Sequence, residues 1–217
     1  MNKYTIGIDE AGRGPLAGPV SVGVACVPAD FNWDQIPGVN DSKKLTEKKR
    51  EEIFDIANSL EKEGKLQTEV VMVAANVIDE IGIVPSVTKA MHRALHKIEE
   101  NMAKSSRSVL ELEDVRDPYS NVSVKLDGGL KAPDHYSNQE TIVKGDAKEK
   151  VIGLASIMAK VTRDRYMVQR HAEPDFAVYM FDAHKGYGTK KHREAIAQNG
   201  LSVEHRRSYC KQISKGT

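Results

Sequence analysis

Short apolar runs separated by glycine and proline dominate the N-terminal part of the chain. The runs at residues 4–9 and 19–28 are rich in valine, isoleucine and small residues, and a turn rich in glycine and proline joins them. This pattern predicts two largely buried strands that are antiparallel neighbours in one sheet. Comparable runs predict further strands at residues 66–75, 121–127 and 139–146.

Two amphipathic segments lie between these strands. Residues 41–64 combine an apolar face with a heavily charged one, and Ser42 or Thr46 could serve as the N-cap of the predicted helix. Residues 85–103 predict a second helix, with Pro85 in its first turn. Four apolar side chains recur there at helical spacing, namely Val87, Met91, Leu95 and Ile98.

The C-terminal third is mostly helical in its pattern. Residues 150–170 are apolar enough to form a largely buried helix, and residues 190–200 and 202–213 predict two shorter, basic helices. Residues 101–120 are charged and weakly periodic, which predicts a long connection. The mixture of strands and helices indicates an α/β protein with a mixed central sheet flanked by helices and a helical C-terminal region.

Length and composition add few constraints on function. The 217 residues, 40% of them hydrophobic, can bury one sizeable core, so we expect residues 1–217 to form a single domain. The net charge is only +1, so a nucleic-acid partner would have to bind to local basic clusters. Cys26 and Cys210 have neither disulfide nor zinc spacing, and no signal or membrane segment is evident. We therefore expect a soluble cytoplasmic protein.

Acidic residues end three of the predicted strands. Asp9 with Glu10, Asp127, and Asp146 each lie next to glycine-containing turns. A solvated turn is the simplest interpretation of one such end, but three ends in a sheet can converge on one edge. Four uncompensated carboxylates would repel one another, so we expect divalent cations between them.

All-oxygen ligation favours Mg²⁺ or Mn²⁺, and two such ions can activate a water and stabilise the leaving oxygen of a phosphoryl displacement. Because neighbouring residues on a strand point to opposite faces, Asp9 and Glu10 can share this site only if the chain leaves strand geometry there. Gly12 and Gly14 make that departure easy.

Six ordered motifs between residues 4 and 209 resemble ribonuclease HII: GIDEAGRGPLAGPV, DSKKL, KGDAK, ASIMAKVTRDR, HKGYGT and HRRSY. The resemblance implies a ribonuclease H-like fold and an endonuclease that cleaves the RNA strand of RNA–DNA hybrids. It also implies cleavage at single ribonucleotides embedded in duplex DNA, leaving 3′-hydroxyl and 5′-phosphate ends. The family's metal-binding acids match Asp9, Glu10, Asp127 and Asp146.

The resemblance also assigns substrate-binding residues. Gly12, Arg13 and Gly14 match a turn whose backbone senses the ribose 2′-hydroxyl, and glycine suits such a close approach. Tyr187 matches a tyrosine that packs on the sugar at the RNA-to-DNA step, although a buried core tyrosine is the alternative. Ser42, Lys43 and Lys44 match a family segment that lies near the phosphates of the DNA strand. Three further lysines could extend this basic track: Lys185, Lys190 and Lys191. For each lysine, a position on a solvated helix face is the alternative.

Other polar residues have structural interpretations. Asp164 is a rival to Asp146 as the fourth acid, but its neighbours Arg163 and Arg165 indicate a structural ion pair instead. Lys125 shares a strand face with Asp127 and could pair with the acidic cluster. The three histidines of the basic C-terminal part are expected to be hydrogen-bonded structural residues: His184, His192 and His205.

Three other functions fit the sequence less well. The spacing of Gly12, Gly14 and Gly18 is wrong for a nucleotide-binding loop, and Asp9 and Glu10 would repel a pyrophosphate. A non-catalytic hybrid-binding protein is disfavoured because all four acids are intact. Ribonuclease HIII usually carries an extra N-terminal domain, for which no room precedes Tyr4. No sliding-clamp peptide is evident at the C-terminus, no membrane partner is indicated, and we expect a monomer.

Overall fold

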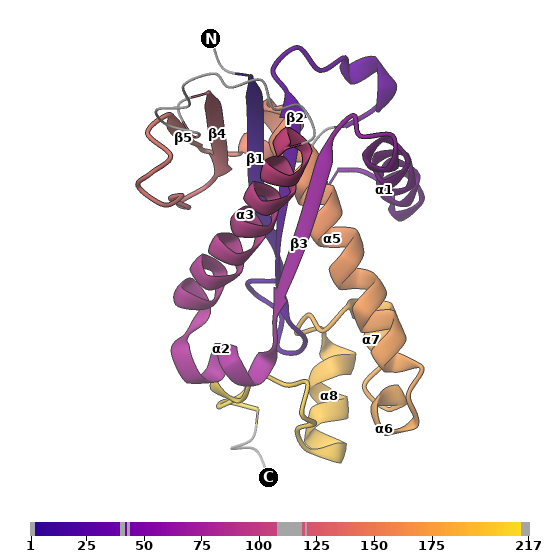
Figure 1. The fold of residues 1–217 in the computed structure, drawn as a ribbon. Helices are drawn as coiled ribbons and strands as arrows, with labels where there is room; N and C mark the ends of the chain where they lie inside the picture. Colours follow the sequence, from indigo (N-terminus) through magenta and orange to yellow (C-terminus); the bar gives the residue numbers. More distant parts are fainter. Residues whose placement is uncertain (1–2, 40–41, 43, 108–118, 120, 214–217) are drawn as a thin grey trace.

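A five-stranded mixed sheet forms the centre of the protein (Figure 1). The computed structural model describes residues 3–39, 42, 44–107, 119 and 121–213. The strand order is β3-β2-β1-β4-β5, in which β1 pairs antiparallel with β2 and parallel with β4. The strands are β1 (Tyr4–Ala11), β2 (Val20–Pro28), β3 (Gln67–Val73), β4 (Val122–Asp127) and β5 (Gln139–Ile142).

Two long helices cover the two faces of this sheet (Figure 1). α3 (Ile83–Arg107) packs on β2 and β3, and the predicted apolar stripe from Val87 to Ile98 is buried against that face. α5 (Lys150–His171) packs on β1 and β2 from the other side, together with α1 (Glu47–Lys62). The mixed sheet with flanking helices is therefore confirmed.

Two strand glycines allow α5 to lie directly on the sheet. A Cβ at Gly7 would lie 2.3 Å from the Val151 carbonyl oxygen, and one at Gly23 would lie 2.2 Å from the Ala155 carbonyl oxygen. Any larger residue would push the helix away. This close approach brings Ser156, in the middle of α5, next to the end of β1.

α5 extends beyond the sheet into a smaller C-terminal part (Figure 1). Short helices surround its end: α6 (Pro174–Ala177), α7 (Phe181–His184) and α8 (Lys190–Asn199). Their apolar side chains form a separate cluster that includes Met167 of α5 and Leu16 and Ala17 from the β1–β2 connection. None of the helices in the described ranges combines the length and hydrophobicity that a bilayer span needs.

The structure decides between the two predicted caps of the first helix and differs from the predicted helices in two places. Thr46, and not Ser42, caps α1, since its hydroxyl accepts from the Lys49 amide at 3.2 Å. α3 continues to Arg107, so the predicted connection from residue 101 is wrong for its first part; residues 108–118 and 120 lie outside the described part of the chain. α2 (Ala75–Ile81) was not predicted.

The C-terminal segment 202–213 is not an α-helix. It contains only a 3-10 turn, Arg207–Tyr209, whose amides at Arg207 and Ser208 donate to Asp79 of α2. The Arg206 amide donates to the Leu16 carbonyl. Because these amides bond to distant segments, they are not available for helical hydrogen bonds.

Strand ends also differ from the predictions. β5 ends at Ile142 and the predicted strand 139–146 finishes as the short helix α4 (Gly145–Lys148) after Lys144 adopts a φ of 56°. β1 pairs with β2 as far as Ala11, opposite Ser21. The expectation that the chain leaves strand geometry at Asp9 and Glu10 is therefore wrong.

Candidate active site

Asp9 and Asp127 come from neighbouring parallel strands at the same level of the sheet. Ile8 pairs with Leu126, so each aspartate follows one member of this pair. Alternation along the strands places both carboxylates on the face covered by α5 and places Glu10 on the opposite face. β4 ends at Asp127 while β1 continues to Ala11, so the β1 edge beyond Asp9 is open on the β4 side.

Asp9 is the most strongly perturbed acid of the site. Only 3% of its surface is exposed. Burial raises the pKa of Asp9 to about 7, the Ser156 hydroxyl bond opposes this rise, and the charges of Glu10 and Asp127 add to it. The Glu10 amide also donates to Asp9 Oδ1 at 2.7 Å. Asp9 therefore holds its negative charge less readily than an ordinary carboxylate and has two other acids close to it.

A pair of buried serine hydroxyls lies behind Asp9. Ser156 Oγ lies 2.7 Å from Ser42 Oγ, and Arg50 Nη1 donates to the Ser42 carbonyl at 3.0 Å. Ser42 precedes α1 and is only 4% exposed. Its hydroxyl thus contacts the interior behind Asp9 and is not exposed to a substrate.

The third acidic segment lies directly next to Asp127. The Gly145 amide donates to Asp127 Oδ1 at 2.6 Å, and Asp146 follows, buried in the first turn of α4. Lys125 does not pair with these acids: its Nζ lies 2.8 Å from Glu149 Oε2. Glu149, at the start of α5, is a nearer partner on the same face than the acidic cluster.

The acids form a donor set for a hard divalent cation. All four offer only carboxylate oxygens, and Asp9 is coupled to two of the others by like charge. In the described residues as they are placed, no three Asp, Glu, His or Cys side chains already surround one point as a ligand set. A cation between them would relieve the repulsion that raises the pKa of Asp9, so the chemistry of the residues fits a metal.

Two fully buried arginines hold the turn that follows β1. Arg206 donates to the carbonyls of Gly12, Arg13 and Gly18, at 2.6, 2.9 and 3.0 Å. Gly12 has a φ of +90°, and a Cβ there would lie 2.2 Å from Arg163 Nε. Burial and the nearby Arg163 lower the pKa of Arg206 to about 10. The Arg13 side chain points outward and its Nη1 lies 3.0 Å from Glu10 Oε1.

Tyr187 lies on a loop bonded to this turn. The amides of Leu16 and Ala17 donate to the Gly186 carbonyl, at 2.9 and 3.3 Å. The Tyr187 side chain is 43% exposed, so it is not a buried core tyrosine. Its ring lies 5.8 Å from both Lys160 Nζ and Arg163 Cζ.

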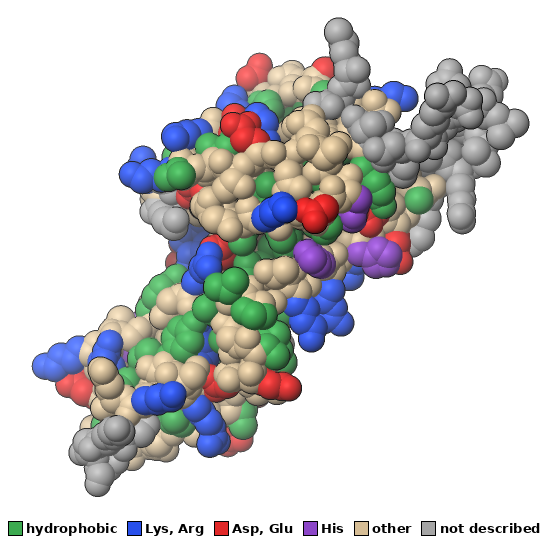
Figure 2. All heavy atoms as spheres, turned by 90° about the vertical axis from the view of Figure 1, so that its left-hand side faces the viewer, with side chains coloured by type: hydrophobic (Ala, Val, Ile, Leu, Met, Phe, Trp, Pro, Cys, Tyr) green, Lys and Arg blue, Asp and Glu red, His purple; other side chains and the backbone are tan. Residues whose placement is uncertain are grey.

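The predicted basic track is partly visible. Lys44 is exposed before α1, and Lys185, beside Tyr187, donates to the Asp182 carbonyl. Lys190 and Lys191 are exposed in the first turn of α8. Lys43 lies outside the described residues. The surface is hollowed between the sheet-bearing part and the C-terminal part, with basic side chains at the edge of the hollow (Figure 2).

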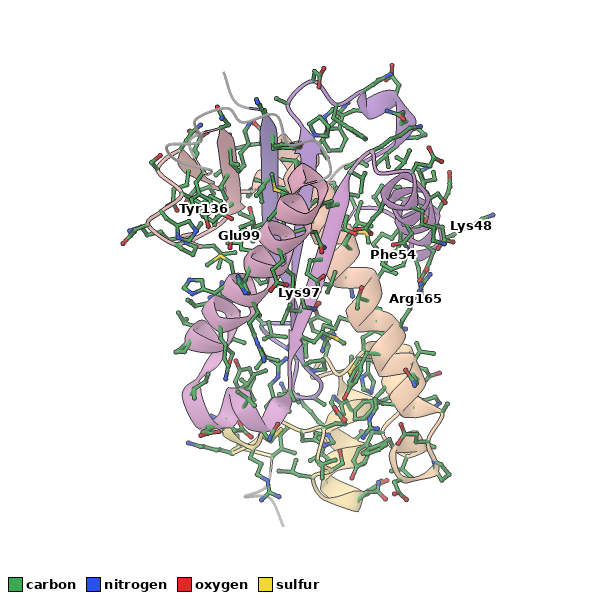
Figure 3. All side chains as sticks on the ribbon, viewed as in Figure 1. Lys48, Phe54, Lys97, Glu99, Tyr136 and Arg165 are labelled. Carbon is green, nitrogen blue, oxygen red and sulfur yellow. The ribbon has the colours of Figure 1, made fainter. Side chains whose placement is uncertain are left out.

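Asp164 and the three histidines have structural roles, as predicted. Asp164 forms its ion pair with Lys160, whose Nζ lies 2.7 Å away; the expected pairing with its neighbours Arg163 and Arg165 is wrong. Arg165 instead contacts Phe54 and Glu51 of α1 (Figure 3).

The histidines are joined by short polar contacts. His192 Nε2 lies 3.1 Å from His205 Nε2, and His184 Nε2 lies 2.7 Å from the Tyr179 carbonyl oxygen. Burial lowers the pKa of His192 and of His205 to about 4. These rings are therefore neutral at physiological pH and belong to the packing behind the Tyr187 loop.

Two important residues were not singled out in the sequence. Ser156 is a polar residue in the middle of an apolar helix, and that contrast is a signal that could have identified it. Arg206 is one of two adjacent arginines in a basic segment, and nothing local distinguishes the buried Arg206 from the exposed Arg207.

Comparisons with known proteins agree with this site. The family model of ribonuclease HII matches residues 6–212. A ribonuclease HII from Endomicrobium trichonymphae is 44% identical over 203 residues, which cover 94% of this chain and 83% of that relative.

Two solved structures share the fold. The ribonuclease H2 from Pyrococcus horikoshii OT3 superposes with a TM-score of 0.65 at 23% identity and covers 98% of both chains. Bst-RNase HIII in complex with Mn²⁺ gives a TM-score of 0.68 at 17% identity, covering 99% of this chain and 70% of that one.

The mixed sheet and the helices on its two faces define an α/β protein with a ribonuclease H-like fold. Within that class, the chain belongs to the ribonuclease HII family. It is a metal-dependent endoribonuclease that cleaves the RNA of RNA–DNA hybrids.

Proposed function

We propose that the enzyme cleaves both RNA–DNA hybrids and duplex DNA containing single ribonucleotides, leaving 3′-hydroxyl and 5′-phosphate ends. The observation that carries the proposal is the convergence of acidic residues at one level of the sheet: Asp9 and Asp127 follow the paired residues Ile8 and Leu126, and the Gly145 amide, next to Asp146, donates to Asp127. In this proposal, Asp9, Glu10, Asp127 and Asp146 bind two divalent ions; Glu10 points to the opposite strand face from Asp9 but reaches the ions at the open β1 edge, where its charge is near enough to raise the pKa of Asp9. When bound, such ions supply Lewis-acid activation of water and stabilise the leaving oxygen.

The protein groups around the acids orient them. The Ser156 hydroxyl donates to Asp9, and the Gly145 amide holds Asp127 at 2.6 Å. These bonds fix the carboxylate oxygens before a metal arrives, which lowers the entropic cost of binding it.

Substrate recognition requires groups other than the acids, because metals bind the phosphates of either strand type. In the proposal, the Gly12–Gly14 backbone approaches the 2′-hydroxyl, and Gly14 has no atoms within 4 Å of the position of a Cβ. Tyr187, with its exposed ring, packs on the following sugar. Lys43, Lys44 and Lys185 bind phosphates of the duplex.

Either Mn²⁺ or Mg²⁺ suits the donor set, since both are hard ions that prefer oxygen ligands. The solved HIII relative in complex with Mn²⁺ supports the choice of a divalent ion of this kind. Cys26 and Cys210 are both buried and are not joined in a disulfide, which supports a reducing, cytoplasmic location. We further propose that residues 1–217 act as one monomeric catalytic domain.

The test uses a duplex with one embedded ribonucleotide, incubated with and without Mg²⁺ or Mn²⁺. We expect cleavage at the ribonucleotide, with 3′-hydroxyl and 5′-phosphate ends, only when the metal is present. Binding without cleavage would instead indicate a hybrid-binding protein with an inactive site and would overturn the proposal.

A matched pair of variants tests the choice of acids. Asp146→Asn should lower the cleavage rate by several orders of magnitude, because it removes a metal-binding charge. Asp164→Asn removes an equal charge from a largely buried ion pair on α5; it should lower the thermal stability but leave the cleavage rate of the folded protein within about threefold, because Asp164 pairs with Lys160 and not with the acids. An active Asp146→Asn protein beside an inactive Asp164→Asn protein would exclude Asp146 as the fourth ligand.

A further inference from the structure

A buried side chain joins the two loops that carry the recognition groups proposed above, in addition to the backbone hydrogen bonds between them. The Gly12–Pro19 turn and the Tyr187 loop come from opposite ends of the chain, and Arg163 of α5 contacts both. Its Nε donates to the Pro19 carbonyl at 2.8 Å and its Nη2 to the Ala17 carbonyl at 3.0 Å. Its Nη1 donates to the Lys185 carbonyl at 2.9 Å.

Arg206 is equally buried but has a different set of partners. Its three carbonyl bonds go to Gly12, Arg13 and Gly18, all within the turn. Both guanidinium groups are 0% exposed. Arg206 therefore shapes the turn alone, whereas Arg163 also fixes where the Tyr187 loop lies relative to it.

The two loops approach each other too closely to tolerate rearrangement at low cost. A Cβ at Gly186 would lie 2.3 Å from the Ala17 carbonyl oxygen, and Gly186 has a φ of +84°. The Tyr187 ring lies 5.8 Å from Arg163 Cζ. The same guanidinium that holds the turn therefore also positions the backbone next to Tyr187.

We propose that Arg163 is a positioning residue for junction specificity: it sets the spacing between the turn that senses the ribose and the tyrosine that packs on the next sugar. This inference rests on the proposed function, in which the two groups contact adjacent nucleotides. A substrate with an RNA-to-DNA junction needs both contacts at the correct spacing. Inside a long hybrid, every sugar of the cleaved strand is a ribose and there is no RNA-to-DNA step. The distance between the turn and Tyr187 therefore matters less for that substrate.

Lysine in place of arginine tests this idea without removing the charge. A lysine ammonium cannot span three carbonyls in the planar arrangement of a guanidinium. The measured quantity is the ratio of kcat/KM on a single embedded ribonucleotide to kcat/KM on a long RNA–DNA hybrid. Arg163→Lys should lower this ratio about tenfold, because small displacements of positioning groups have large effects on rate. Arg206→Lys should lower both values together and leave the ratio within about twofold.

Controls separate positioning from a loss of stability. Arg165→Lys changes an exposed arginine on the same helix, which contacts α1, and should leave both activities and their ratio unchanged (Figure 3). Thermal unfolding is measured for every variant. If Arg163→Lys does not fold, Gly186→Ala, which pushes the same two loops apart without altering a charge, should lower the ratio instead.

Tyr187→Ala distinguishes failure of this inference from failure of the proposed function. If Tyr187→Ala leaves the ratio unchanged, the junction role of Tyr187 is wrong. If Tyr187→Ala lowers the ratio but a folded Arg163→Lys does not, or if Arg206→Lys lowers it as much as Arg163→Lys, the positioning role of Arg163 is wrong. Since Arg163 acts through Tyr187, the double variant should show the same ratio as Tyr187→Ala alone.

Discussion

Among the acids, Asp9 depends most on a single neighbour. Its carboxylate is buried, and the Ser156 hydroxyl is the side-chain donor that favours its charged form. Ser156 can donate only one proton, so Ser42 must donate to Ser156 for both hydroxyl contacts to be satisfied. The order of donation therefore runs from Ser42 through Ser156 to Asp9.

Removing this donor should weaken metal binding. We expect Ser156→Ala to lower the affinity for Mn²⁺ by about 10- to 100-fold, the usual effect of losing a group that orients a metal ligand. Isothermal titration with the metal alone measures it, and Ser59→Ala, which removes a serine hydroxyl from the exposed face of α1, is the control. Equal affinity of Ser156→Ala and wild type would show that Asp9 needs no such donor.

At the level of helices and strands, the pattern of apolar residues predicted an element correctly where burial of that element against the sheet imposes the pattern. The stripe from Val87 to Ile98 and the apolar centre of α5 predicted those helices, because burial imposes their periodicity. The segments 190–200 and 202–213 are both short and basic, but only the first forms a helix. The second is irregular because its amides bond to Asp79 and Leu16. These partners are far away in the sequence, so no local pattern reveals them.

The close packing of α5 on the sheet predicts that the strand glycine Gly23 cannot be enlarged without a loss of stability. Gly23→Ala should lower the free energy of unfolding by about 1–3 kcal/mol, the typical cost of overpacking, because the new Cβ meets the Ala155 carbonyl. Gly129→Ala, at a position with no atoms within 4 Å, should change it by less than about 0.5 kcal/mol. Chemical denaturation measures both; equal effects would mean that α5 can move away from β2 at little cost.

For the molecule as a whole, the buried histidines make stability depend on pH. The pKa values of His192 and His205 are lowered to about 4 by burial, while unfolded histidine titrates near 6.5. Between these values the unfolded chain binds more protons than the folded one, so stability is fully present above about pH 6.5 and is lost as the pH falls toward 4.

The measurement is the free energy of unfolding between pH 7 and pH 4. His205→Gln should reduce the loss over this range by on the order of 1–3 kcal/mol, because glutamine does not bind a proton. His96→Gln, which changes an exposed histidine on α3, should leave the pH dependence unchanged. A His205→Gln protein with the wild-type slope would place the acid sensitivity in other groups.

The sequence predicted those site residues that can be recognised from their immediate neighbours along the chain. Acids that end strands beside glycine are visible in the sequence, and their convergence follows from strand pairing. The bonds of Arg163 to Pro19 and of Arg206 to Gly12 join positions 144 and 194 residues apart, and one arginine in a basic segment resembles another. The sequence left open whether Asp9 and Glu10 share one face, because the answer depends on how far the ladder to β2 continues; it continues through Ala11 and places them on opposite faces.

The dependence of the Gly12 turn on Arg206 also fixes a sequence of events during synthesis. The turn is made among the first residues, but its buried donor follows 194 positions later. At the usual speed of translation, about 5–20 residues per second, roughly 10–40 s separate the two. A growing chain therefore carries its first acids long before the buried donor of the loop beside them is made, and the ribonucleotide recognition that we propose for this loop is among the last properties that the newly made enzyme acquires.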